Sequence, residues 1–139
     1  MFNRRFAGIV IGLVVLLLAS GCQSQSNQEL ALNAGLTEEE FVQLDRGIKE
    51  DAGEATARNY RIKRITIPDN PGLIREVTSV TEVKDSTEIW CIEIDYGVGS
   101  YARDQEGYFA RTENGIVVFG VLGGGPNGTR EVWWERFGC

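Results

Sequence analysis

The chain has 139 residues with 14 basic and 20 acidic side chains, a net charge of −6 and no histidine. This length suits one domain with one modest hydrophobic core. The acidic balance argues against nucleic-acid binding, which needs a basic surface. The lack of histidine removes the commonest general base and the commonest neutral metal ligand. We therefore expect a protein that is not an enzyme and holds no metal or other cofactor.

The first 22 residues differ in character from the rest of the chain. Arg4 and Arg5 precede an apolar run that extends from Ile9 to Ala19. About a dozen apolar residues suit the hydrophobic region of an export signal and fall short of the ~20 residues that span a bilayer. Small residues follow this run, and then comes Cys22. The pattern predicts an export signal that ends at a cysteine.

The stretch Leu18-Ala19-Ser20-Gly21-Cys22 resembles the lipobox of bacterial lipoproteins, although Ala19 stands where that family favours leucine. The resemblance implies cleavage after Gly21, a diacylglycerol on the Cys22 sulfur and often an acyl chain on the new amino group. Two or more such chains would hold the protein firmly on a membrane. The alternative is an uncleaved signal anchor in which Cys22 has no special role.

This resemblance divides the chain into three parts. They are a cleaved signal peptide at 1–21, a lipidated cysteine with a flexible tether at 22–36, and a single globular domain at 37–139. Cleavage removes two of the 14 basic side chains, so 12 basic and 20 acidic ones remain and the net charge becomes −8. We expect this domain outside the cytoplasm, in the bacterial cell envelope. Gln23 is not the aspartate that would resemble a signal for retention at the inner membrane, so the resemblance favours the outer membrane where there are two membranes.

Cys91 and Cys139 are the cysteines that remain once Cys22 carries lipid. Disulfides persist outside the cytoplasm. A bond between these two residues would close a loop of about 48 residues and contribute up to ~4 kcal/mol in the loop-entropy model. The alternative is two free thiols, one of which packs as a small buried hydrophobe.

Thr37 and Glu40 predict the start of a helix. Thr37 can cap the free backbone amides and Glu40 can reach back to it, which makes a capping box. Apolar residues then recur at helical spacing. Gly47 weakens this helix, and Gly53 is its expected end. The apolar stripe consists of Phe41, Leu44, Ile48, Ala52 and Ala55.

From residue 60 onward the pattern favours strands. We expect them over Tyr60–Ile67, Arg75–Lys84, Glu88–Tyr96 and Thr129–Phe137, and in a hairpin. In Glu88–Tyr96, the face that carries Trp90 is expected to be buried and the face that carries Cys91 to be more polar.

The hairpin is expected to join Tyr108–Glu113 to Ile116–Leu122. Asn114-Gly115 would occupy the centre of its type I′ turn, because these two residues accept positive φ. The predicted fold is therefore α+β, with one N-terminal helix packed on an antiparallel meander sheet of five to six strands. A small β-barrel or sandwich is the alternative. A class-level likeness of this kind says nothing about function.

The long loop Gly97–Gly107 and its flanks form the candidate binding surface. Tyr96, Tyr101, Arg103 and Tyr108 supply rings with polar tips and one positive charge. Long loops on a rigid sheet often carry function, and tyrosine is frequent at interfaces. In the alternative interpretation, these tyrosines only close the end of the sheet.

Three functions remain open from the sequence. The leading hypothesis is a non-enzymatic envelope lipoprotein that binds a protein partner or stabilises an envelope assembly, and contacts the membrane only through Cys22. The second is a lipoprotein that binds a small molecule or glycan in a pocket lined by Tyr96, Tyr101 and Trp90. The third is a hydrolase that uses carboxylates alone, such as Asp95 and Glu106, which would have to face each other across a cleft.

Overall fold

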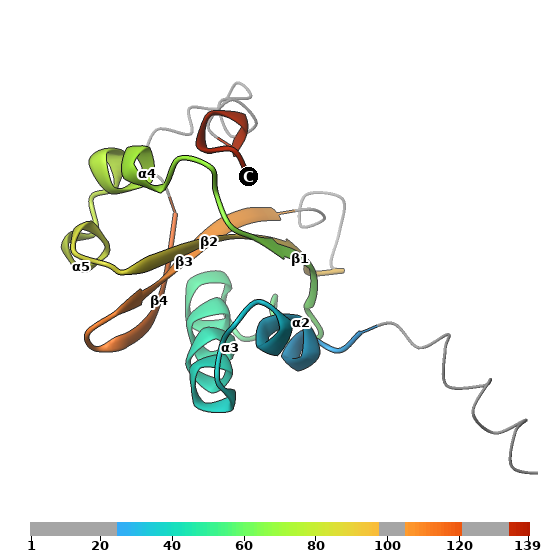
Figure 1. Ribbon diagram of the computed structural model, residues 1–139. Coiled ribbons are helices and arrows are strands. Elements are labelled where there is room, and N and C mark those ends of the chain that lie inside the picture. The colour runs from blue at the N-terminus through green and yellow to red at the C-terminus, as the bar shows by residue number, and fades with distance from the viewer. Residues whose placement is uncertain (1–24, 98–104, 121–133) are drawn as a thin grey trace, which may run out of the picture.

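The computed structural model describes residues 25–97, 105–120 and 134–139. Within these ranges, four antiparallel strands form one sheet in the order β1-β2-β3-β4. Helices cover both faces of this sheet (Figure 1). The α+β class and the meander topology are therefore confirmed, whereas the described residues contain four strands and not five or six. The strands are β1 (Arg61–Thr66), β2 (Glu88–Asp95), β3 (Gln105–Thr112) and β4 (Gly115–Phe119).

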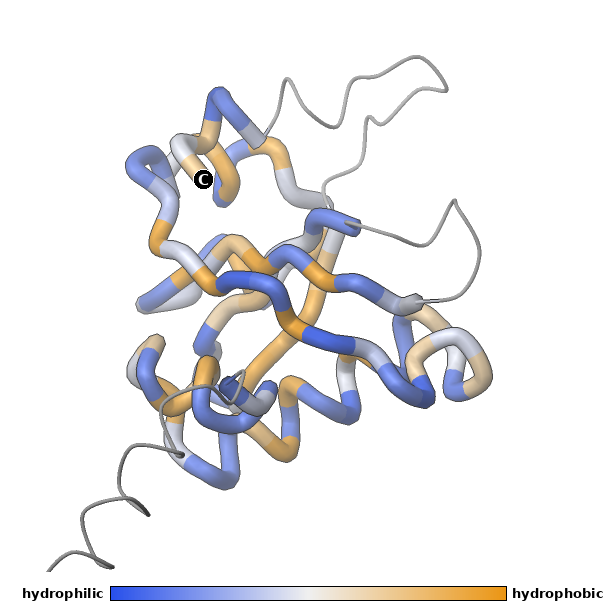
Figure 2. The backbone as a smooth tube through the Cα atoms, turned by 90° about the vertical axis from the view of Figure 1, so that its right-hand side faces the viewer, coloured by the Kyte–Doolittle hydropathy of each residue, from blue (hydrophilic) through white to orange (hydrophobic). Residues whose placement is uncertain are grey.

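The two faces of the sheet bury separate hydrophobic clusters. Helices α2 (Asn27–Asn33) and α3 (Glu38–Ala52) cover the face with the first cluster, in which Trp90 and Phe109 stack with ring centroids 5.0 Å apart. Helices α4 (Pro71–Val77) and α5 (Thr81–Lys84) and a helical turn at 134–137 cover the other face, which carries the second cluster around Cys91 and Tyr108. Hydrophilic and hydrophobic stretches alternate along the chain, as expected for elements that bury one side (Figure 2). None of the helices in the described ranges is both long and apolar enough to cross a membrane.

Helix α3 begins and ends where the sequence predicts. The Thr37 side chain accepts a hydrogen bond from the Glu40 amide, and the Glu40 carboxylate accepts one from the Thr37 amide, so the capping box is complete. Gly53 ends the helix with a φ of 86°. The apolar stripe lies against the sheet, with Leu44 and Ile48 fully buried. Ala55 lies beyond the helix and is exposed.

The predicted tether at 22–36 is wrong over most of its length, because the fold already begins at Asn27. Ser26 caps α2, and Ala31 and Leu36 are buried in the first cluster. The Asn27 side chain accepts a hydrogen bond from the Ile62 amide at 2.8 Å and donates one to the Tyr60 carbonyl at 3.0 Å. Apolar residues at helical spacing therefore pack this segment against the domain, although its many polar residues predicted a flexible tether.

The predicted strand over Arg75–Lys84 is also wrong, because α4 and α5 occupy this stretch. Asn70 caps α4 through a hydrogen bond from the Leu73 amide to its side chain, and Pro71 occupies the first turn. Asparagine followed by proline is a typical helix start. This local signal outweighs the strand preference of the valines and threonines that follow.

Strand β2 is buried on both faces, and this corrects the polar environment predicted for Cys91. Cys91 is fully buried in the second cluster, under α4, α5 and the C-terminal turn. Its sulfur lies at bonding distance from that of Cys139, with the two Cα atoms 5.8 Å apart, so the predicted disulfide is formed. Only Glu93 and Asp95, near the end of the strand, keep the polar character expected for this face.

The hairpin is present, but its turn differs by one residue from the prediction. Thr112 pairs with Gly115, so Glu113 and Asn114 are the central residues and Gly115 already belongs to β4. Gly115 has a φ of 108°, and the Thr112 hydroxyl donates to its carbonyl. A glycine with positive φ after a two-residue turn is typical of the longer hairpin connections that begin with a type I turn.

The strand predicted over Thr129–Phe137 is wrong at its end, where residues 134–137 are helical and bury Trp134 and Phe137. Residues 129–133 lie outside the described ranges. The same holds for Cys22 and for Tyr101 and Arg103 of the candidate surface.

Candidate functional site

The structure does not assemble the predicted tyrosine surface from the members that it describes. Tyr108 is 5% exposed and packs in the second cluster against Phe119 and Trp134. Tyr96 packs against the first cluster, on the opposite face of the sheet. Burial raises the pKa of both phenols, assisted by Asp51 at Tyr96 and by Glu106 at Tyr108. These two rings thus help to close the core and do not share a surface.

Of the two carboxylates of the hydrolase hypothesis, Asp95 lies beside a basic residue, whereas Glu106 lies beside another acidic one. Asp95 is 3.8 Å from Arg61 and accepts a hydrogen bond from the Gly97 amide at 2.8 Å. Glu106 lies opposite Glu93 in the sheet, and Glu93 contacts Lys63 at 3.3 Å and Arg64 at 3.2 Å. Asp95 and Glu93 thus form ion pairs with basic side chains of β1, which a structural role explains.

A groove along β4 has a volume of about 580 Å³. One wall is the part of α3 between Gln43 and Asp51, and the other is the 114–118 stretch of the hairpin. We call it the α3–β4 groove. A smaller cavity of about 240 Å³ shares Asp51 and Val118 with the groove and is also lined by Tyr96.

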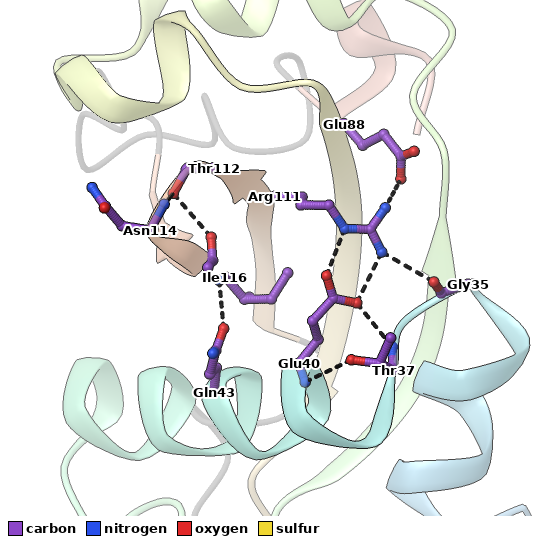
Figure 3. A network of polar contacts seen from close by, with 10 residues as sticks. Gly35, Thr37, Glu40, Gln43, Glu88, Arg111, Thr112, Asn114 and Ile116 are labelled. Carbon is purple, nitrogen blue, oxygen red and sulfur yellow. Dashed lines mark hydrogen bonds and ion pairs between the residues drawn. The ribbon is translucent and has the colours of Figure 1, made fainter.

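Strand β4 forms the edge of the sheet as described, since it pairs there only with β3. The Ile116 amide donates to the Gln43 side chain at 2.8 Å and therefore points away from β3 (Figure 3). Backbone directions alternate along an antiparallel strand. The amide and carbonyl of Val118 consequently also point away from β3, into the groove.

Gly47 lets α3 approach β4 closely beside this edge. A Cβ atom at Gly47 would lie 2.7 Å from Cγ2 of Val118 and 3.2 Å from its Cβ. These contacts are too short, and Val118 cannot easily move away from them because a β-branched side chain has little rotamer freedom. The glycine that weakens α3 as an isolated helix is therefore required for packing it on the sheet.

Arg111 holds the N-terminal end of α3 against the sheet (Figure 3). Its guanidinium donates to Glu40 at 2.6 and 2.9 Å, to Glu88 at 2.6 Å and to the Gly35 carbonyl at 3.1 Å. It also lies 5.2 Å from the centre of the Trp90 ring. The hydrogen bonds from Arg111 lower the pKa of Glu40. Glu40 thus serves both the helix cap and this network, which fixes one wall of the groove.

The groove also carries charged side chains of both signs. Arg46, Glu50 and Asp51 line it, and none of them forms an ion pair within the described part of the chain. Within the same part, no three acidic or cysteine side chains gather as a metal site would require. The groove therefore offers backbone groups, apolar side chains and charges of both signs, which suit an extended polypeptide.

Gln43, Gly47 and Arg111 were not among the site residues expected from the sequence. A glycine within an otherwise regular helix was the available signal for close packing. The run of uncharged residues over β4 was the signal for an open edge. Gln43 and Arg111 act through contacts 73 and 71 residues away along the chain, which no local pattern shows.

Comparison of the chain with protein-family models, with curated proteins and with solved structures returns no match.

Proposed function

We propose that this chain is a lipid-anchored protein of the bacterial cell envelope whose globular domain is a binding domain without enzymatic activity. The membrane attachment is the one that the lipobox-like stretch ending at Cys22 implies. The binding site is the α3–β4 groove, where an extended segment of a protein partner would pair with β4 as a further strand.

The uncharged, accessible edge of β4 is the observation that supports this proposal most. Sheet edges of soluble proteins usually carry charges, prolines or bulges that prevent pairing with other chains. β4 has the sequence Gly-Ile-Val-Val-Phe and a regular register with β3. An apolar edge beside a groove of about 580 Å³ is the arrangement that strand addition uses.

Small-molecule or glycan binding has less support. The cavity lined by Tyr96 has a volume of about 240 Å³, below the usual range of roughly 300–1,000 Å³ for ligand pockets. Trp90, which was expected to line such a pocket together with Tyr96, is 2% exposed and stacks on Phe109 in the core. Strand addition at β4 needs no deep pocket.

Site-specific photo-crosslinking in native membranes tests the proposal. A photo-reactive residue at exposed Asn114, on the rim of the groove, should give defined protein adducts. The same residue at exposed Arg64, on the opposite edge strand β1, is the matched control and should give none. Equal adducts from both positions, or none from Asn114, would contradict the proposal.

Replacing Cys22 by serine should release the chain from the membrane, and retention would contradict the lipid anchor.

A further inference from the structure

We propose that the partner of β4 is the β4 strand of a second copy of this chain, so that two sheets join through the α3–β4 groove in a symmetric dimer. This inference rests on the proposed binding role of the groove and identifies its occupant. Three features of the groove point to a second copy: the composition of β4, the direction of its backbone groups and the order of charges along α3.

The composition of β4 permits pairing with itself. In a two-fold arrangement the same strand faces itself in the antiparallel direction. Like charges directly opposite each other would destabilise such a pair. β4 has no charged residue, and within a single chain all its residues are already half-buried or buried. Strand β1, with Arg61, Lys63 and Arg64, would place several positive charges against one another.

The backbone groups fix where the two-fold axis can lie. Ile116 and Val118 direct their amides away from β3, but Gln43 already accepts from the Ile116 amide. Among the described residues, the outward-facing amide of β4 that has no hydrogen-bond partner is therefore that of Val118. An axis at Val118 lets the two Val118 residues exchange a pair of N–H···O=C bonds, as in a hydrogen-bonded antiparallel pair.

The charges of α3 complement one another in this register. Gly47 lies over Val118, so the same axis relates the two α3 helices at the level of Gly47 and makes them antiparallel. At 1.5 Å per residue, Arg46 of one copy and Glu50 of the second then differ by about 3 Å along the helix axis. Side chains tilt toward the N-terminus of their own helix, which brings Arg46 and Glu50 together and separates the two arginines.

An axis at Val117 would lose this complementarity. Moving the two-fold axis from Val118 to Val117 shifts the point at which it passes α3 by one strand residue, or ~3.3 Å, toward the N-terminus of the helix. Arg46 would then lie within ~4 Å of its own symmetry mate along the axis and ~10 Å from the second Glu50. The charges therefore select the register centred on Val118. Each Arg46, unpaired within the described residues of one chain, gains an ionic partner in the dimer.

Charge reversal tests this dimer without altering the fold, because Arg46 and Glu50 are both exposed. The full processed chain is studied in detergent by sedimentation equilibrium, with Arg46→Glu, Glu50→Arg and Arg46→Glu/Glu50→Arg as variants. Each single variant places like charges at both contacts and should weaken self-association about tenfold or more. The double variant should restore it. An equimolar mixture of the two single variants should form heterodimers, because both contacts are then of opposite sign.

Two results would overturn the dimer. One is a monomer for the unaltered chain at every concentration used. The other is self-association that all three variants retain equally, which would place the interface elsewhere. Crosslinks from Asn114 to a different envelope protein, together with a monomeric chain, would overturn the dimer while leaving the binding role of the groove intact. A lack of any crosslink from Asn114 would contradict both.

Discussion

The two edges of the sheet are built in opposite ways. β1 carries three charged residues and a register shift between Ile62 and Arg64. Its Ile62 amide donates a hydrogen bond to the side chain of Asn27 in α2. The C-terminal segment closes its far end, where the Thr66 hydroxyl donates to the Cys139 carbonyl. β4 is uncharged and has a regular register. Within the described structure, Gln43 alone forms a hydrogen bond with an outward-facing backbone group of β4. The contrast indicates that one edge is protected against pairing and the other is left available for it.

Removing the disulfide should have the largest effect, and it should affect the β1 side. Cys139→Ala removes the link that pins the C-terminal segment beside β1. We expect a loss of about 2–4 kcal/mol in the free energy of unfolding, because the unfolded chain regains its freedom. Hydrogen exchange at Asp69 and Asn70 should also become faster, since their amides donate to the Gly138 and Phe137 carbonyls.

The matched control for this variant is Cys22→Ser, which should leave the free energy of unfolding unchanged. Urea denaturation of both chains provides the comparison. A Cys139→Ala chain as stable as the unaltered one would show that the disulfide does not secure this edge.

Replacing Arg111 should have the next largest effect, and it should loosen the α3 wall beside β4. Arg111→Ala removes the contacts with Glu40, Glu88 and the Gly35 carbonyl. Hydrogen bonds to charged groups contribute roughly 1.5–3 kcal/mol, so we expect a loss of about 2–3 kcal/mol. The control on the other edge is Arg64→Ala, whose more exposed ion pair with Glu93 should contribute less than about 1 kcal/mol. Equal losses in thermal or urea unfolding would refute this difference between the edges.

Adding a methyl group at Gly47 should separate α3 from β4. Gly47→Ala gains about 1 kcal/mol of helix propensity but introduces a contact that costs about 1–3 kcal/mol. We expect a net loss of about 1 kcal/mol in urea denaturation. Val118→Ala in the same chain makes room for the new methyl group, so the double variant should be more stable than the sum of the single effects. A Gly47→Ala chain that gains stability would show that the close approach is not needed.

The acid sensitivity of the α3 wall should be the smallest effect. The pKa of Glu40 is lowered from 4.5 in the folded chain, chiefly by its hydrogen bonds with Arg111. This carboxylate therefore stabilises the fold above pH 4.5, and its contribution is lost as the pH falls through the lowered pKa. Glu40→Gln should flatten the decrease in stability between neutral and acid pH. Glu38→Gln, in the same helical turn, should not, and an equal flattening by both would contradict the role of Arg111.

The sequence predicted those elements whose signals are local. The capping box at Thr37, the glycine end at Gly53 and the alternation along β2 all involve neighbours in the chain. The disulfide was predictable because removing Cys22 leaves two cysteines. The helices at 71–84 were misjudged because the strand preference of valine and threonine was weighed above the Asn70-Pro71 start. The second buried face of β2 could not be predicted, since it depends on the C-terminal turn returning over Cys91.

The candidate site likewise depends on contacts between residues that are distant in sequence, which local patterns do not show. Tyr96 and Tyr108 lie close to one loop in sequence, yet strand alternation places them on opposite faces of the sheet. The α3–β4 groove depends on contacts such as that between Gln43 and Ile116, which are distant in sequence. Its apolar edge was visible in the sequence as an ordinary strand, but only the topology shows that this strand lies at the edge of the described sheet.

Amide hydrogen exchange at Val118 tests the difference between the two edges most directly. The Arg46→Glu chain, expected to be monomeric, is measured in dilute solution and compared at Val118, Ile116 and Ile62. We expect the Val118 amide to exchange at least about 100-fold faster than those of Ile62 and Ile116, which donate to Asn27 and Gln43. In the unaltered chain, Val118 should become protected as the protein concentration rises. A Val118 amide that exchanges as slowly as Ile62 in the dilute variant would contradict the open edge of β4.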